Sequence, residues 1–582
     1  MRTFVAHRGI TNKTRGGSVM KKNMKKLCAL VMAVSMVAMT GCGGSKPAET
    51  TAAPAAAETT AAAEATTEAA AEAPAGASVS QDTDIVAAMA VDFTTMDPMD
   101  TSDTLSGGVQ RLMMDGLFGF DDDMKIIPML ATGYEANDDA TEFVIKLREG
   151  IQFSDGTPWN AEAAKANLDR WGDKTLGLKR TTLLCNILDK TEVVDEYTVK
   201  VTLAESFGAF IPTLAHPACV CVSPAVIAKG NEEAASNPVG TGQYTFVEWV
   251  AGEHTTIALN KDWWGYDAEI CGGTALADPD AGFKTITFKP VSEGATMVAM
   301  LQAGDAQVIW PVPTENMEGL KGDSNVAVGQ ATGIVARYLL MNNQKAPFND
   351  VRVRQAINYA INKDAYCAVV KNGIAAPAQS IIGPAVQHFK ANDPYPYDPE
   401  KAKSLLAEAG YPDGFKTTIM CNTTTSNLKQ AEFYQQQLAI VGIDVEIVAL
   451  ENAVLNQRVQ DVDVPGAEAE VELYISGWSP STGDADWGIR PLLAIESEPP
   501  MSYNMCYYEN PEFDQLIHDA LATADESRRA ELYATAQDLI WEECPLISVC
   551  IDDNTWATSN KITDVKVYPD GAVNLRNGKM AQ

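Results

Sequence analysis

The chain has 582 residues, of which 77 are Asp or Glu and 44 are Lys or Arg, so its formal net charge is −33. Such an acidic surface repels nucleic-acid phosphates and no basic stripe offsets it, so we expect no nucleic-acid binding. The length exceeds what one hydrophobic core normally serves, which predicts two or three domains.

Residues 1–41 have the pattern of an export signal. A basic cluster at 21–26 precedes thirteen apolar or small residues at 27–39, broken only by Ser35. This core is typical of a signal peptide and too short to span a bilayer. It ends at Met-Thr-Gly-Cys42, which resembles the lipobox of bacterial lipoproteins and implies cleavage before Cys42 and a diacylglyceryl thioether on its sulfur. The alternative is an ordinary secretory signal with a chance cysteine, and Met20 competes with Met1 as the start.

Residues 42–83 are rich in Ala, Thr, Glu and Pro. A segment of this composition cannot build a core, although its Ala/Glu portion can be helical. We interpret it as a tether between the lipid anchor and a folded body.

Cysteine and histidine set limits on the chemistry. After Cys28 and Cys42, nine cysteines remain without a C-x-x-C pair. An odd number in an exported protein predicts buried free thiols, with one or two disulfides as the alternative. The histidines lie far apart without metal-ligand spacing, so we expect no metal site.

From about 84 to 330 strand patterns dominate. Alternating apolar residues at 142–153 run into a Glu149-Gly150 turn, which predicts a hairpin. Similar strand patterns occur at 191–203, 242–249 and 255–259.

From about 340 to 550 helices with clear start signals take over. Asp350, Asp398-Pro399 and Asn510-Pro511 each precede a helical pattern. A helix at 429–440 followed by a strand at 443–448 is typical of an α/β lobe. The fold class is therefore α/β with a strand-rich first part.

Seven segments, in order, resemble the family-5 solute-binding proteins of ABC importers, which bind peptides, nickel complexes or glutathione. They are TTMDP (94–98), LREGIQFSDGTPWNAEAAKANLDRW (147–171), NPVGTGQYTFVEW (237–249), MLQAGDAQVIWPVP (300–313), APFNDVRVRQAINYAINKDA (346–365), YPYDPEKAKSLLAEAGYPDGF (395–415) and ENPEFDQLIHDALATADESRRAELYATAQDLIWEECP (509–545). Three further segments, LKRTTLL (178–184), RYLLMN (337–342) and GWSPSTGDADWGIRPLL (477–493), are most similar to the glutathione receptors of this family.

The resemblance implies a periplasmic-binding-protein-like bilobal clamshell of type II, cluster C, with an extra strand-rich domain. Domain I would comprise 84–125, 238–330 and 556–582, domain II 126–237 and domain III 331–555. Two crossing segments would form the hinge, with the ligand in the cleft between the lobes. The family implies no enzymatic activity and no cofactor. It also implies a monomer that docks on a permease of the cytoplasmic membrane.

The segment 477–487, GWSPSTGDADW, has three competing interpretations. It lacks the last glycine of a nucleophile elbow, and no phosphate-binding loop supports a metal–nucleotide site at Asp484-Ala485-Asp486. A solvated loop in which Asp484 caps the next helix is the second interpretation. A wall of the ligand pocket is the third, and we favour it.

In the dipeptide and oligopeptide receptors, an aspartate three residues after this tryptophan holds the peptide ammonium, whereas this chain has Ser481. A buried ammonium without a charged partner is costly, so ordinary capture of a peptide N-terminus is in doubt. Asp484 and Asp486 are our candidates to meet the ammonium of a glutathione-like ligand.

Arginine matches a carboxylate with two parallel hydrogen bonds. Arg180 and Arg337 would lie on opposite lobes and bridge a dianionic ligand, unless each forms a protein ion pair instead. Trp310, Trp478, Trp487 and Tyr338 are candidates for apolar walls, although most aromatic residues of an α/β chain belong to its core.

The sequence thus predicts a lipid-anchored binding protein on the outer face of the cell membrane or in the periplasm. It would capture a small peptide-like solute, glutathione or a γ-glutamyl relative, for an ABC permease. The alternatives are a general dipeptide or oligopeptide receptor, a metal-chelate or haem carrier, and a surface hydrolase built on Asp484 and Asp486.

Overall fold

The computed structural model describes residues 80–581. The predicted signal, Cys42 and most of the predicted tether lie outside the described residues. The described part begins with the short 3-10 helix Ser80–Asp82, four residues before the predicted domain boundary. The Ser80 hydroxyl accepts the Met580 N–H at 2.9 Å, so the first described residue is tied to the C-terminal segment.

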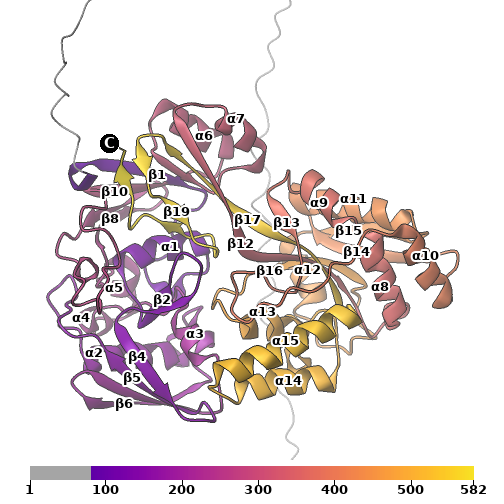
Figure 1. The fold of residues 1–582 in the computed structure, drawn as a ribbon, viewed down its shortest axis with the longest axis horizontal. Coiled ribbons are helices and arrows are strands. Elements are labelled where there is room, and N and C mark those ends of the chain that lie inside the picture. Colours follow the sequence, from indigo (N-terminus) through magenta and orange to yellow (C-terminus); the bar gives the residue numbers. More distant parts are fainter. Residues whose placement is uncertain (1–79, 582) are drawn as a thin grey trace, which may run out of the picture. The chain divides into compact units, whose positions relative to one another are not determined.

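The described residues form one eleven-stranded mixed sheet in the order β15-β14-β16-β12-β17-β11-β1-β10-β9-β8, with β13 paired to β17. Figure 1 shows β12 and β17 running side by side through its middle. The strands are β1 (Asp84–Met89), β8 (Tyr244–Val250), β9 (His254–Leu259), β10 (Thr285–Pro290), β11 (Val308–Trp310), β12 (Val326–Met341), β13 (Ala375–Pro377), β14 (Lys416–Asn422), β15 (Asp444–Leu450), β16 (Leu473–Trp478) and β17 (Leu546–Ser559).

Strands β12 and β17 cross from one half of this sheet to the other. Their register is continuous from Val326 to Thr332, with one irregularity between Thr332 and Ala336 and a second between Arg337 and Tyr338. An irregularity that interrupts the ladder bends the strand locally. These strands are the candidates for the two crossing segments that the family resemblance implies, and the hinge stays a prediction.

A separate four-stranded antiparallel sheet has the order β4-β5-β7-β6. Its strands are β4 (Ala131–Ala136), β5 (Glu142–Leu147), β6 (Leu188–Asp195) and β7 (Thr198–Leu203). The predicted hairpin at 142–153 is wrong, because β5 pairs with β4 and β7 rather than with the segment after Gly150. Alternation identified the strand, but its partners depend on segments farther along the chain.

Three two-stranded ribbons complete the strands of the described residues. They are β2 (Phe118–Phe120) with β3 (Ile126–Pro128), β18 (Ile562–Thr563) with β21 (Lys579–Met580), and β19 (Lys566–Val567) with β20 (Val573–Asn574).

The predicted helix starts at Asp350, Asp398 and Asn510 are confirmed. Each of these side chains accepts a backbone N–H from the first turn of its helix, which satisfies a group that the helix itself leaves unpaired. The helices are α1 (Thr104–Met113), α2 (Ala161–Gly172), α3 (Phe210–Leu214), α4 (Pro224–Ile227), α5 (Asn231–Ser236), α6 (Gly294–Ala303), α7 (Met317–Lys321), α8 (Val351–Ala360), α9 (Lys363–Val369), α10 (Pro399–Glu408), α11 (Thr425–Ala439), α12 (Asn452–Val459), α13 (Ala485–Leu493), α14 (Pro511–Leu521) and α15 (Glu526–Glu543).

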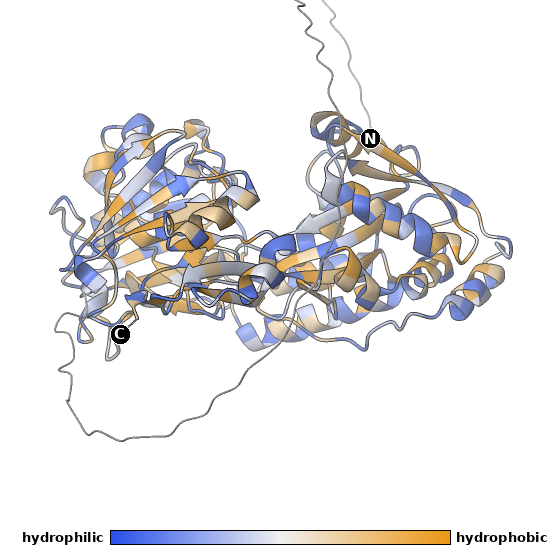
Figure 2. Ribbon diagram, turned by 90° about the horizontal axis from the view of Figure 1, so that it is seen from above, coloured by the Kyte–Doolittle hydropathy of each residue, from blue (hydrophilic) through white to orange (hydrophobic). Residues whose placement is uncertain are grey.

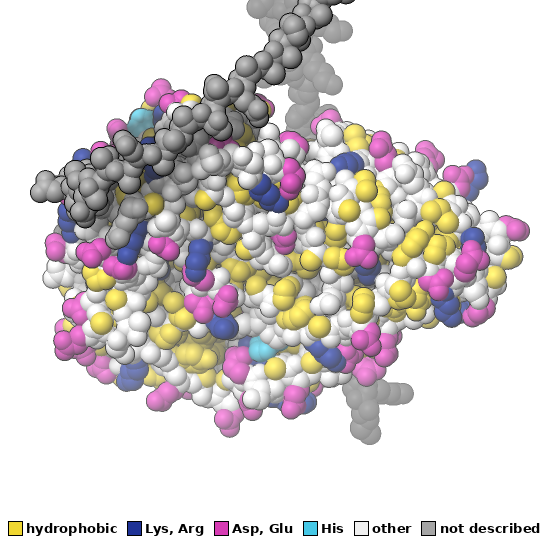
Figure 3. All heavy atoms as spheres, turned by 45° about the horizontal axis from the view of Figure 1, so that its top comes forward, with side chains coloured by type: hydrophobic (Ala, Val, Ile, Leu, Met, Phe, Trp, Pro, Cys, Tyr) yellow, Lys and Arg dark blue, Asp and Glu magenta, His cyan; other side chains and the backbone are white. Residues whose placement is uncertain are grey.

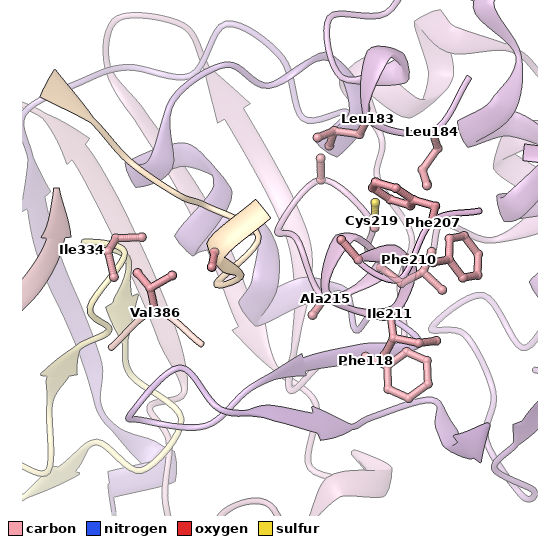
Figure 4. Packing of buried hydrophobic residues seen from close by; sticks show 14 of the residues in the cluster. Phe118, Leu183, Leu184, Phe207, Phe210, Ile211, Ala215, Cys219, Ile334 and Val386 are labelled. Atoms are coloured by element: carbon pink, nitrogen blue, oxygen red, sulfur yellow. The ribbon is translucent and has the colours of Figure 1, made fainter. Parts of the chain in front are cut away.

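The hydrophobic core is built from segments that lie far apart in the sequence. One cluster of buried side chains contains Phe118 and Phe210 from the first part and Ile334 and Val386 from the second, and Figure 4 shows how these residues lie. Figure 2 shows apolar ribbon along the inner strands and alternating polar and apolar residues on the helices. Contacts join the described residues into one unit, and the division into three domains stays a prediction.

The surface agrees with the charge of the sequence. On the face in Figure 3, acidic side chains are spread over the molecule and the few basic ones gather into no stripe. Among the described residues, no helix combines the length and the apolar character that crossing a membrane requires.

Candidate functional site

A cavity of about 310 Å³ lies where segments from distant parts of the chain meet. One wall comes from the segment 98–110 and from Arg180, the other from 478–487 and Tyr503, and 216–218 and Asp570 complete the lining. A second cavity, beside α1, measures about 30 Å³, which suits a water molecule rather than a solute. The larger cavity is therefore the candidate binding site.

The N-terminal turn of α1 forms part of the wall. Asp103 caps this helix, because its carboxylate accepts the Ser106 N–H at 2.8 Å. Gly107 lies at the cavity, and a side chain there would approach Pro217 within 3.6 Å. The positive end of the helix dipole thus faces the cavity and favours a negatively charged ligand group.

Arg180 is held in place by backbone oxygens rather than by an acid. Its guanidinium donates to the carbonyl oxygens of Thr101 and Ser102, both at 2.9 Å. Burial lowers the pKa of Arg180, and Asp103 and Tyr503 partly offset this. An arginine stays protonated nonetheless, so the cavity wall carries a positive charge.

Two charged groups of the lining are left without an ion pair. Asp570 pairs with Arg111 at 2.6 Å, whereas neither Arg180 nor Asp103 forms a salt bridge within the described residues. The site therefore offers one cation and one carboxylate to a ligand.

Aromatic rings cover a further part of the wall. The ring centroids of Trp478 and Trp487 are 5.7 Å apart, and those of Trp478 and Tyr503 are 4.8 Å apart. The Trp478 indole N–H donates to the Trp487 carbonyl at 2.6 Å, which fixes the ring at the end of β16. These faces can pack against the apolar part of a solute.

Ser481 lies in the lining and contacts His216. The imidazole Nε2 is 3.0 Å from the Ser481 hydroxyl, and the ring's Nδ1 accepts the Ala218 N–H at 3.0 Å. Burial, together with Arg180 and Arg111, lowers the pKa of His216 to about 3, so the ring is neutral. Ser481 is thus an uncharged polar group, as the sequence indicates.

The structure does not bring Asp484 and Asp486 to the cavity. Asp484 is 0% exposed, and both its oxygens accept from Arg529 at 2.9 Å. Burial alone would raise the pKa of Asp484, but Arg529, His388 and the Asp486 N–H together outweigh it and hold the value at about 2. Asp486, also buried, binds Arg490 through both oxygens at 2.7 and 2.8 Å.

These ion pairs bear on the interpretations of the segment that contains Asp484 and Asp486. Each carboxylate has an arginine partner away from the cavity, so they cannot act together on a ligand as an acid–base pair. Asp484 does cap α13, because it accepts the Asp486 N–H at 2.8 Å. The capping role was predicted, but the buried arginines were not.

Arg337, Tyr338 and Trp310 also lie outside the lining. Arg337 pairs with Asp552 at 2.6 Å in the middle of the large sheet. Tyr338 is 1% exposed and donates its hydroxyl to the Ile381 carbonyl at 2.6 Å, and Trp310 is a core side chain on β11. Of the predicted site residues, Arg180, Trp478, Trp487 and Ser481 meet at the cavity, and their contact with a ligand stays a prediction.

Sequence reasoning missed Asp103, His216, Tyr503 and Asp570. The Ser-Asp-Thr segment before α1 is a helix-start signal that could have drawn attention to Asp103. Nothing in the sequence links His216 to Ser481, which lies 265 residues away.

Cysteines and metal-binding groups are the remaining candidates for chemistry. The nine cysteines of residues 80–581 are free, most of them buried, in agreement with the predicted thiols. No group of three or more His, Cys, Asp or Glu side chains with a metal-binding arrangement occurs in that part of the chain.

Comparisons with known proteins identify relatives of this chain. The model of the bacterial extracellular solute-binding proteins, family 5, matches residues 125–496. The glutathione-binding protein GsiB of Escherichia coli K12 is 40% identical over 489 residues, which cover 84% of this chain and 92% of that protein. GsiB of Pectobacterium atrosepticum is 39% identical over 501 residues, covering 86% of this chain and 94% of that protein.

Solved structures share the fold. HbpA2 of Haemophilus parasuis superposes with a TM-score of 0.75 at 25% identity, covering 86% of this chain and all of that one. The binding protein DppA of Helicobacter pylori, in complex with the peptide STSA, has a TM-score of 0.66 at 27% identity and covers 86% and 98% of the two chains. With its fold, its cavity and these relatives, the chain belongs to family 5 of the bacterial extracellular solute-binding proteins.

Proposed function

We propose that this protein captures glutathione or a related γ-glutamyl peptide for an ABC importer. The observation that carries the proposal is the cavity, where Arg180 has no acidic partner and Ser481 has no charge. The glutathione-binding proteins that are 40% identical over most of the chain support it.

The charges of the cavity match those of such a ligand. Glutathione carries two carboxylates and one ammonium. Arg180 and the N-terminal turn of α1 can each accept a carboxylate, and Asp103 can take the ammonium. This assignment replaces Arg337, Asp484 and Asp486, whose partners are protein side chains. A micromolar affinity corresponds to about −8 kcal/mol, which two charge-assisted contacts and aromatic packing can supply.

A general peptide receptor is the second candidate. The neighbour DppA of Helicobacter pylori holds a peptide, and Asp103 could bind a peptide ammonium. A general peptide receptor would have similar affinity for many dipeptides, whereas the unpaired Arg180 together with the uncharged Ser481 favours a ligand with more carboxylates than ammonium groups, as glutathione has.

We further propose that binding leaves the solute chemically unchanged and that the loaded protein docks on a permease of the cytoplasmic membrane. The lipobox-like sequence at Cys42 supports a lipid anchor outside the cytoplasm. We propose that the protein acts as a monomer.

A ligand panel tests the function. The protein lacking residues 1–42 is titrated calorimetrically with glutathione, its disulfide, mixed dipeptides and nickel–histidine. We expect glutathione or its disulfide to bind and the others not. Equal binding of many dipeptides would replace the proposal with a general receptor.

The role of Arg180 is tested in the same assay. Arg180→Met is expected to weaken glutathione binding by about 1.5–3 kcal/mol, because a charge-assisted contact is lost. Arg528→Met, at an exposed ion pair on α15, is the matched control and should bind like wild type. Wild-type affinity of Arg180→Met would remove the guanidinium from the site.

A further inference from the structure

His216 and Ser481 form a hydrogen bond within the lining of the cavity. His216 follows α3 and is 5% exposed, and Ser481 lies in the loop between β16 and α13. Their 3.0 Å contact is made by segments 265 residues apart. It lies in the lining itself, beside the open volume.

The geometry fixes which atom donates. The Nδ1 of His216 accepts the Ala218 N–H, so it carries no hydrogen. The ring is neutral because it is buried near two arginines, so its single hydrogen is on Nε2. Nε2 must therefore donate, and the Ser481 oxygen must accept.

The serine hydroxyl is then left with one hydrogen to donate. A hydroxyl has one hydrogen and two lone pairs, and the His216 contact uses one lone pair. Within the described residues, no other hydrogen bond of the Ser481 hydroxyl is found, and its residue borders the cavity. The hydrogen is available to a group inside the cavity.

We propose that His216 is a positioning residue that turns Ser481 into a hydrogen-bond donor for an acceptor group of the solute, a carboxylate or an amide carbonyl. This inference rests on the proposed function and explains which solutes that site would select. An ammonium at this position finds a neutral oxygen and no countercharge, which is a costly environment in a site that also holds the Arg180 cation. The pair thus favours solutes that present an acceptor here and disfavours those that present an ammonium.

Ser481 variants test the donor. Ser481→Ala removes the hydrogen and is expected to weaken glutathione binding about tenfold or more, as for a charge-assisted hydrogen bond. Ser481→Asp reverses the polarity and is expected to weaken it further while raising the affinity for alanyl-alanine, which presents an ammonium. Ser476→Ala on β16, outside the lining, is the control and should bind like wild type.

His216 variants test the positioning role. Glutamine can keep an N–H near the serine, whereas leucine cannot. We expect His216→Gln to retain the preference for glutathione over alanyl-alanine and His216→Leu to lose most of it. If the leucine variant does not fold, the two Ser481 variants still decide the proposal, because they alter a side chain at the cavity surface.

The possible outcomes distinguish a failure of the inference from a failure of the proposed function. Wild-type ligand preference in both Ser481→Ala and Ser481→Asp would overturn the inference, and a loss on Arg180→Met in the same series would leave the proposed function in place. Failure of the wild-type protein to bind glutathione or its disulfide would overturn the proposed function itself.

Discussion

Single side chains acquire their roles here from burial and from the charge of their neighbours. Arg529 and Asp484 are both 0% exposed and pair through both carboxylate oxygens, so the aspartate is structural although it follows a pocket-lining loop. Arg180 is half-buried, bound only by carbonyl oxygens, and remains free to pair with a ligand. His216 stays neutral because burial and two cations oppose its protonation.

The neutral state of His216 predicts a pH dependence of stability. Its pKa is about 3 in the folded protein and about 6.5 in an unfolded chain. Between these values only the unfolded chain binds the proton, so the stability falls as the pH is lowered below about 6.5. From pH 7 to pH 5 we expect the free energy of unfolding of wild type, relative to His216→Gln, to fall by about 2 kcal/mol.

Urea unfolding of both proteins at the two pH values measures this change. Every other titrating group is common to the pair, so its contribution largely cancels. A constant difference between wild type and the variant would mean that His216 titrates normally.

The turn before α3 packs so tightly against the end of α14 and the loop between α14 and α15 that it leaves no room for a larger side chain at Gly208. The Gly208 N–H donates to the Leu521 carbonyl at 2.7 Å. A Cβ at Gly208 would lie 2.3 Å from the Thr523 carbonyl oxygen and 3.1 Å from Arg529 Nε. These are backbone and buried atoms, so they cannot move aside without shifting their elements.

Gly208→Ala is therefore expected to push the two elements apart. Because α3 leads from Gly208 to His216, and Arg529 on α15 binds Asp484 in the loop that contains Ser481, we expect the affinity for glutathione to fall at least several-fold and the protein to lose about 1–3 kcal/mol of stability. Calorimetric titration and thermal unfolding measure the two effects. Gly133→Ala is the control, since nothing lies within 4 Å of its added Cβ. Unchanged affinity in Gly208→Ala would show that this contact does not support the site.

At the scale of the whole molecule, one sheet connects the parts that enclose the cavity. Strands β12 and β17 pass through its middle, and their register is interrupted between Thr332 and Ala336. A ligand that contacts the segments with Arg180 and with Ser481 together would stabilise this arrangement relative to any in which they lie apart.

The proposed anchor also belongs to this scale. Mature protein purified from membranes is expected to begin at Cys42 and to carry the added mass of a diacylglyceryl group, which mass spectrometry of the N-terminal peptide detects. Cys42→Ser should release the protein from the membrane without changing glutathione affinity. An unmodified N-terminus at another residue would contradict the lipobox.

Features that depend only on neighbouring residues could be predicted from the sequence. The helix starts at Asp350, Asp398 and Asn510 follow from a side chain within a few residues of the backbone N–H that it binds. Strand alternation identified β5, and an ordered set of local motifs indicated the family before any fold was known.

Which polar and charged side chains pair with each other, and which face the cavity, depends on the tertiary structure. Arg337 meets Asp552 across 215 residues, Asp484 meets Arg529 across 45, and His216 meets Ser481 across 265. The physical reason is that an ion pair or a long-range hydrogen bond depends on which segments pack together. The local sequence pattern constrains that packing only weakly. Residues of the same type therefore lie in the core, in an ion pair or at the cavity wall, according to which segments pack around them.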